Sequence, residues 1–198
     1  MYRKIIIGLG IVALIILVIT WVSGFYNGLV NSRERVNAKW ANVEAQYQRR
    51  SDLIPNLVST VKGAADFEKS TLEAVMSARA SATQIKIDAD NLTPEKLQQF
   101  QQAQGQVSSA LGRLLAVAEN YPQLRAVQNF SELQAQLEGT ENRINEARRQ
   151  FIEAVQTYNA SIKRFPGMIV ANLTGFKEKP NFQADAGAEK ASKVTFPK

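Results

Sequence analysis

An apolar run near the amino-terminal end limits the folds open to this chain more than any other segment. The eighteen residues from Ile5 to Val22 contain no charged side chain. As a helix rising about 1.5 Å per residue, the run is about 27 Å long, close to the thickness of a bilayer's hydrocarbon core. No other stretch of the sequence is comparably apolar. The run therefore predicts one transmembrane helix that tethers a soluble domain to a membrane.

Two alternatives compete with this interpretation of residues 5–22. A cleaved signal peptide would use the small residues after Val22, but the run exceeds the usual apolar region of about 7–15 residues. A buried core helix rarely combines this length with a basic start. Aromatic residues at the far end suit a membrane interface. We interpret the segment as an uncleaved signal anchor, and its predicted lipid contacts include Ile5, Leu9, Leu14, Leu17 and Val22.

The charges on either side of the run predict its orientation. Arg3 and Lys4 precede it directly, whereas the first basic residue after it is Arg33. Positive charges close to a membrane span favour the cytoplasmic side. We therefore expect a single-pass protein of the cell (inner) membrane with its domain outside the cytoplasm, on the periplasmic or extracellular face.

Composition excludes most catalytic chemistry. The chain has no histidine and no cysteine, so histidine-based catalysis, thiol chemistry, disulfides and histidine metal sites are absent. It also lacks both glycine-rich nucleotide-binding fingerprints. Without Arg3 and Lys4, 22 basic and 18 acidic residues remain, too even a balance for a nucleic-acid surface. We expect no enzyme activity, no cofactor, no metal and no nucleic-acid partner.

Spacing predicts an all-α fold in which the anchor is followed by an antiparallel four-helix bundle with long helices. The first bundle helix continues from the anchor at about Phe25, and later ones cover about 51–83, 93–121 and 129–165. Apolar side chains recur every three or four residues, as in coiled coils. The predicted helix starts are Ser51 with Pro55 in the first turn, Thr93 with Pro94, and a capping box at 129–132.

The predicted organisation has three parts. Residues 1–24 form the cytoplasmic tip and anchor, 25–167 the bundle, and 168–198 a polar tail with scattered aromatic residues. Pro166 and Gly167 stop the last bundle helix. The tail's aromatic rings could dock in a groove of the bundle or of a partner, and disorder beyond Gln183 is the alternative.

Polar side chains interrupt the apolar seams and form the candidate site. A buried polar layer best serves to fix the register between helices, and we favour that role. A carboxylate-lined metal or ligand site is the alternative, although di-metal bundles normally use histidine. A double-mutant cycle of Glu141 and Arg143 would show whether these two residues are a coupled structural pair. The candidate residues are Arg79, Gln104, Thr140, Glu141, Asn142 and Arg143.

Several long motifs resemble the LemA family of bacterial membrane-anchored helical proteins. The strongest are RRSDLIPNLV at 49–58 and LGRLLAVAENYPQL at 111–124. Others follow in the family's order: YNGLV at 26–30, GTENRI at 139–144, Phe165-Pro166-Gly167, and the closing aromatics Phe176 and Phe182. The resemblance implies one amino-terminal membrane span followed by a helical bundle, and it supplies no reaction or catalytic residues.

The resemblance and the composition together favour a non-enzymatic scaffold or adaptor of the bacterial envelope. The family resemblance implies links to envelope stress, membrane protein quality control and membrane proteases. We therefore expect the lipid bilayer and other envelope proteins, with a membrane protease among the candidates, as partners; a homo-oligomer is an open possibility. An extracytoplasmic ligand sensor and a carboxylate-based metal-binding bundle are the alternatives.

Overall fold

The computed structural model describes residues 2–63 and 68–183, and in that part of the chain every regular element is helical. The all-α prediction, with a long apolar helix at the amino-terminal end, is confirmed. The elements are α1 (Tyr2–Lys62), α2 (Lys69–Gln84), the 3-10 turn η1 (Ala89–Asn91), α3 (Pro94–Ala118), α4 (Pro122–Arg125), α5 (Gln128–Lys163) and α6 (Gly167–Thr174).

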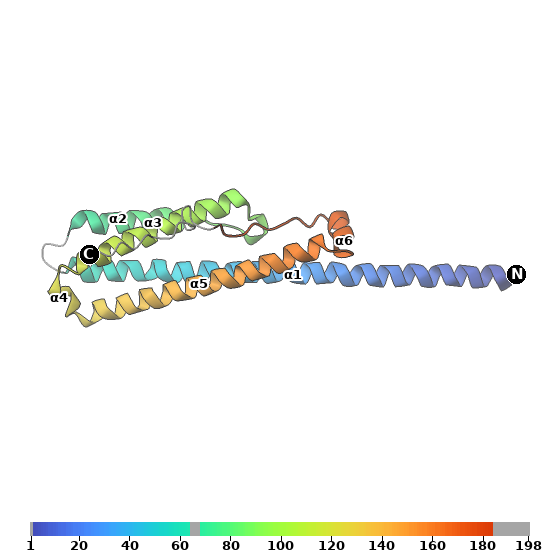
Figure 1. Cartoon of the computed structure of the whole chain (residues 1–198), viewed down its shortest axis with the longest axis horizontal. Coiled ribbons are helices and arrows are strands. Elements are labelled where there is room, and N and C mark those ends of the chain that lie inside the picture. The colour runs from blue at the N-terminus through green and yellow to red at the C-terminus, as the bar shows by residue number, and fades with distance from the viewer. Residues whose placement is uncertain (1, 64–67, 184–198) are drawn as a thin grey trace, which may run out of the picture.

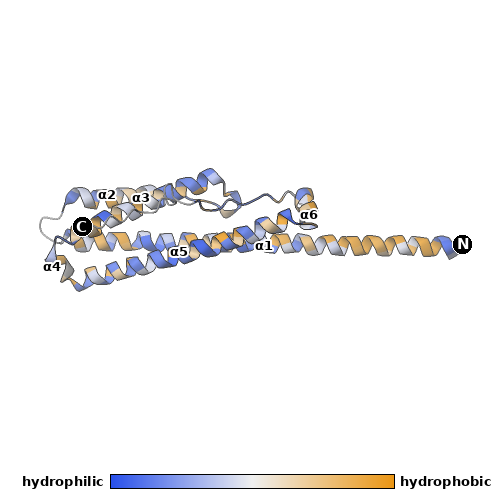
Figure 2. Cartoon of the chain, viewed as in Figure 1, coloured by the Kyte–Doolittle hydropathy of each residue, from blue (hydrophilic) through white to orange (hydrophobic). Residues whose placement is uncertain are grey.

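Helix α1 contains both the apolar run and the first helix of the domain. It continues without interruption for 61 residues, and its amino-terminal part projects alone beyond the other helices (Figure 1). That projecting part is almost entirely apolar (Figure 2), and no residue of its most apolar window is buried. The predicted anchor residues Ile5, Leu9, Leu14, Leu17 and Val22 are all exposed on it. By length and composition α1 is able to cross a membrane.

The domain part of α1 buries one narrow seam. From Val36 onward its buried residues step by fours and threes, which keeps them on one face of the helix. They are Val36, Trp40, Val43, Tyr47, Arg50, Ile54, Leu57 and Val61. Gly24 and Gly28, which separate the apolar run from this seam, lie within the continuous helix.

The helix boundary predicted at Ser51 is wrong, because α1 runs through Pro55 to Lys62. Proline lacks the N–H that would bond to the carbonyl four residues earlier, which here belongs to Ser51. The Nε–H of Arg79, from α2, donates to that same carbonyl at 2.8 Å. The contact between α2 and α1 therefore replaces the hydrogen bond that Pro55 removes. Pro55 and Arg79 have separate roles in the predictions from sequence, which do not link them.

Replacing Arg79 with methionine removes the donor that the Ser51 carbonyl uses in a half-buried position. We expect the loss of this hydrogen bond to destabilise the protein by about 1 kcal/mol or slightly more. The variant Pro55→Ala restores a backbone N–H at that position. In the Pro55→Ala background, Arg79→Met should therefore lower the free energy of unfolding clearly less than it does in the natural sequence. Urea unfolding of the four members of this double-mutant cycle measures the difference, and equal costs in both backgrounds would contradict the compensation.

The four longest helices run alternately up and down as two pairs (Figure 1). Helix α1 packs most extensively against α5, and α2 against α3. Of the seam predicted from Leu97 to Tyr121, six residues are buried and Gln104 and Tyr121 are half-buried. The six are Leu97, Phe100, Val107, Leu111, Leu114 and Ala118. The Thr93 cap is confirmed, since its hydroxyl accepts from the N–H of Lys96 at 3.3 Å. Coiled-coil packing of the four helices stays a prediction.

The predicted capping box at 129–132 is wrong. Helix α5 begins one residue earlier, at Gln128, and no side chain caps it. The carbonyl of Val127 accepts instead from the N–H groups of Phe130 and Ser131. Phe165, the last residue of the helix predicted at 129–165, is 74% exposed because α5 ends at Lys163.

The segment after Pro166 is packed on the bundle as far as the structure describes it. Helix α6 ends at Gly175, whose φ of 79° is a left-handed conformation that favours glycine. Residues 175–183, which we call the strap, then follow the bundle in extended form, with Phe176 and Phe182 against the core. The prediction that the aromatic residues dock on the bundle holds for these two. Phe196 and the predicted disorder lie outside the described residues.

Candidate functional site

A buried arginine at the middle of the bundle joins three helices. Arg50 of α1 is 1% exposed. Its Nη1 donates to the Glu141 carboxylate at 2.6 Å and to the Ser108 hydroxyl at 2.7 Å. Its Nη2 donates to the side-chain and backbone oxygens of Gln104 at 2.6 and 3.1 Å. We call Arg50, Gln104, Ser108 and Glu141 the Arg50 node.

The Arg50 node balances the cost of burying a charge. A guanidinium without partners would be strongly destabilising in the core, but here four acceptors, one of them a carboxylate, compensate it. The guanidinium carbon also lies 5.0 Å from the ring centre of Tyr47, within cation–π range. The Glu141 side chain is 42% exposed, so one end of the pair stays hydrated. Since both terminal nitrogens are occupied, the node serves to connect α1, α3 and α5.

The structure gathers only part of the predicted polar layer. Gln104 and Glu141 belong to the Arg50 node. Glu141 pairs with Arg50, whereas Asn142 and Arg143, the other two residues of this predicted stretch, are exposed. Thr140 is buried but donates only within its own helix, to the Gln136 carbonyl at 2.7 Å.

Arg79, the remaining predicted member, bonds to the Ser51 carbonyl instead of joining the node. Arg50 itself was missed by sequence reasoning. The available signal was its position, since it occupies an inward place in the seam of α1 between Tyr47 and Ile54. An arginine in such a seam needs partners from other helices.

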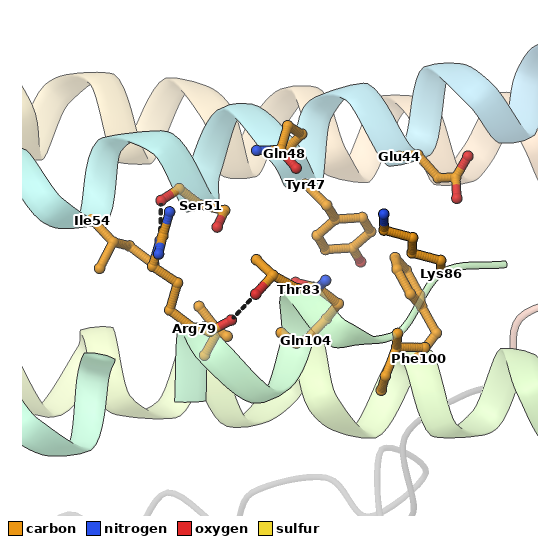
Figure 3. A pocket seen from close by; sticks show the side chains of 13 residues that line it. Glu44, Tyr47, Gln48, Ser51, Ile54, Arg79, Thr83, Lys86, Phe100 and Gln104 are labelled. Carbon is orange, nitrogen blue, oxygen red and sulfur yellow. Dashed lines mark hydrogen bonds between the residues drawn. The ribbon is translucent and has the colours of Figure 1, made fainter. Parts of the chain in front are cut away.

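A cavity of about 140 Å³ adjoins the Arg50 node between α1, α2 and α3 (Figure 3). Gln104, a member of the node, and Tyr47, whose ring lies against Arg50, both line the cavity. Glu44, Arg79 and Lys86 give the cavity charged walls. The buried hydroxyl of Ser51, also in its wall, has no hydrogen-bond partner among the described residues. The volume suffices for several water molecules or a very small polar ligand.

The pKa of two groups in the cavity wall is raised by burial. For Glu44 the loss of hydration is the main cause, and the negative charge of Asp88 adds to it. For Tyr47 burial again dominates and outweighs the opposing charges of Arg148 and Arg50. Glu44 is the one carboxylate among the residues lining the cavity, and no group of three or more metal-ligating side chains is found within the described residues.

Replacing Glu44 with glutamine is expected to stabilise the protein slightly at pH 7. The raised pKa means that the folded state binds the proton more tightly than the unfolded state, whose pKa is near 4.5. The stabilisation that protonated Glu44 contributes is therefore fully present below pH 4.5, and it is lost as the pH rises through the pKa of Glu44 in the folded state. Because Glu44 is only half-buried, the gain should stay below about 1 kcal/mol. Urea unfolding at pH 7 and pH 3.5 measures it, and an equal gain at both values would contradict the assignment.

Comparison with known proteins places most of the chain in one family. The sequence model of the LemA family matches residues 39–196. The magnetosome proteins MamQ 1 and MamQ 2 of Paramagnetospirillum magneticum are each 30% identical over 179 residues, covering 80% of this chain and 64% of theirs. The magnetosome protein MamQ of Magnetospirillum gryphiswaldense is 28% identical over 178 residues, covering 79% and 64%. The chain thus spans about 64% of the length of these relatives.

Proposed function

We propose that this chain, which belongs to the LemA family, is a membrane-anchored, non-enzymatic scaffold. Its apolar amino-terminal segment and the first helix of its domain form one continuous helix. It presents the faces of a stiff helical bundle to protein partners at the membrane. The observation that carries the proposal is the unbroken α1, in which an exposed apolar segment passes directly into the buried seam of the domain.

The continuity of α1 supports a fixed spacing from the membrane. Beyond the apolar run, α1 continues from Phe25 to Lys62. At a rise of about 1.5 Å per residue, this part of the helix extends for about 57 Å. A flexible linker would let the domain sample many positions, whereas one helix keeps the bundle at a set distance and angle. Such a rod suits a protein that positions others.

The side-chain chemistry supports a role without catalysis. The chain has no histidine or cysteine, and the charged centre of the described bundle, the Arg50 node, is already satisfied by its own helices. We therefore propose that the protein acts by binding other proteins and catalyses no reaction. Other envelope proteins are the proposed partners, with a membrane protease as one candidate, and envelope stress or membrane protein quality control as the setting.

Site-specific photo-crosslinking in intact membranes tests the scaffold. A crosslinking amino acid replaces Asn145 on the exposed face of α5 or Gln102 on that of α3. A matched position, Leu14 in the apolar segment, reports lipid contact. Reproducible adducts with the same protein at Asn145 or Gln102 would support the scaffold. Adducts with lipid alone at Leu14, and with no protein elsewhere, would contradict it.

We propose that the domain lies outside the cytoplasm, in keeping with Arg3 and Lys4 before the apolar segment. Because the chain has no cysteine, a single Asn145→Cys substitution gives one reactive thiol on an exposed face. A membrane-impermeant maleimide should label it in intact cells whose outer barrier, where present, has been permeabilised. Labelling only after lysis would contradict this orientation and leave the scaffold role open.

Ligand sensing is the second candidate, and the cavity beside the Arg50 node favours it. Its charged walls and the unpartnered Ser51 hydroxyl could hold a small polar molecule. Native mass spectrometry of the protein released from membranes in mild detergent tests this. A stoichiometric small-molecule adduct that disappears in the cavity-filling variant Ala82→Leu would support it, and its absence from both proteins would count against it.

A further inference from the structure

The outer face of α6 is apolar and exposed, although its inner face is already buried. Gly167, Val170 and Ala171 pack inward, while Met168, Ile169 and Leu173 stay 44, 46 and 80% exposed. Phe165, just before the helix, is a further exposed apolar residue here, at 74%. We call Phe165, Met168, Ile169 and Leu173 the α6 face. A short helix that is apolar on both sides is expected to have a second apolar neighbour.

The position of the α6 face identifies that neighbour. Helix α6 lies beside α1 where α1 leaves the bundle, at the boundary between its buried seam and its exposed apolar segment (Figures 1 and 2). A groove there is lined by Phe25 and Gly28 of α1 together with Phe165 and Gly167. Helix α6 is therefore attached to α1 at the level where the apolar segment of α1 begins.

Aromatic and charged side chains at the same level suit a membrane surface. Trp21 and Tyr26 are 46 and 42% exposed on α1, in the position where aromatic rings mark a bilayer interface. Lys163, Arg164 and Lys177 flank α6 and are exposed. Glu178 is paired with Lys163 at 2.8 Å, so the surroundings keep a net positive charge. Positive charge beside an apolar helix face is complementary to anionic lipid headgroups.

From these observations we propose that α6 is an interfacial membrane helix that rests its outer face on the bilayer surface beside α1. The inference depends on the anchoring part of the proposed function and adds a second, non-spanning contact to it. Two contacts at the base of the bundle would fix its rotation about α1 as well as its distance from the membrane. They would also limit the tilt of α1 and α5 relative to the bilayer.

Single-cysteine fluorescence in vesicles tests this contact in the full chain. The environment-sensitive dye NBD is attached to Leu173→Cys, and in separate proteins to Leu14→Cys and Val127→Cys. Val127 is the matched control, since it is an apolar residue 40% exposed at the opposite end of the bundle. The vesicles contain phosphatidylcholine and phosphatidylglycerol, with or without lipids that carry a nitroxide quencher near the headgroup.

The proposal expects several-fold brighter dye emission at Leu173 than at Val127, and strong nitroxide quenching at Leu173 and Leu14 but not at Val127. Quenching at Leu14 with a water-exposed dye at Leu173 would overturn the α6 contact and leave the anchor intact. A dye at Leu173 shielded from both nitroxide lipid and a water-soluble quencher would also overturn it, because protein would then cover the face. A water-exposed dye at Leu14 would overturn the anchor, and this inference with it.

Discussion

Arg50→Ala is expected to destabilise the bundle by about 3 kcal/mol or more, the largest effect of any charged side chain described above. The substitution removes four hydrogen bonds to α3 and α5 at once. It also leaves the Gln104 and Ser108 groups facing an empty space in the bundle. Urea unfolding of the full chain in detergent micelles measures the change. It is followed by Trp40 fluorescence in a Trp21→Phe background, because Trp21 also emits.

A matched control separates burial from charge in this experiment. Arg149 also pairs with two carboxylates, those of Glu146 and Glu153, but its side chain is 58% exposed. Arg149→Ala should therefore change stability by no more than about 0.5 kcal/mol. If the two alanine variants cost the same, the Arg50 node does not hold the helices together. The variant Glu141→Gln, which retains an acceptor, should cost less than Glu141→Ala because the buried guanidinium keeps a partner.

Removing the strap is the second change with a large expected effect. A chain that ends at Thr174 loses Phe176 and Phe182, which both pack against the hydrophobic core. Phe182 lies 6.2 Å from Trp40 and 5.5 Å from Phe151, ring centre to centre, and the Arg148 guanidinium stacks on its ring at 4.5 Å. Two half-buried rings at about 1–2 kcal/mol each predict a loss of about 3 kcal/mol with the polar contacts included.

The polar contacts of the strap make its position specific. Asn159 exchanges two hydrogen bonds with the backbone of Lys179, at 2.9 and 3.0 Å, and the Tyr158 hydroxyl donates to the Lys177 carbonyl at 2.8 Å. The Lys179 ammonium donates to the Ala89 carbonyl at 2.6 Å, and burial lowers the pKa of this lysine. The strap therefore connects α5 to the η1 turn between α2 and α3.

A chain that ends at Gln183 is the control for this truncation, because it keeps every strap contact described above. The chain ending at Thr174 should unfold at lower urea than the chain ending at Gln183, with a red-shifted Trp40 emission when both carry Trp21→Phe. Equal midpoints for the two truncated chains would contradict a structural role for the strap. Loss of crosslinked partners only in the shorter chain would connect the strap to scaffolding as well.

Together, the node, the strap and α6 provide the rigidity that the proposed membrane-anchored scaffold would need. The Arg50 node connects α1 with α3 and α5, and the strap connects α5 with the turn before α3. Helix α6 then lies between the bundle and the apolar segment of α1. A scaffold needs this rigidity, since a partner is positioned only as well as the body that holds it.

Local patterns were sufficient to predict the class of fold and most of its inward faces. Three successful predictions depend only on residues within one or two helical turns of one another. They are the apolar run that ends at Val22, the steps of three and four from Leu97 to Ala118, and the Thr93 cap. Such relations are encoded in a single segment, because helical periodicity and capping act between near neighbours. The sequence alone therefore determined that the protein is helical and that its first helix is able to enter a membrane.

Only the tertiary structure decided which side chains meet between helices. Arg50 reaches Gln104 across 54 positions of sequence and Glu141 across 91, and Arg79 reaches the Ser51 carbonyl across 28. These pairings depend on how the helices are shifted and rotated against one another, which periodicity does not encode. For this reason α1 continues through Pro55 where the local pattern predicted a new helix, and Glu141 pairs with Arg50 instead of its near neighbour Arg143.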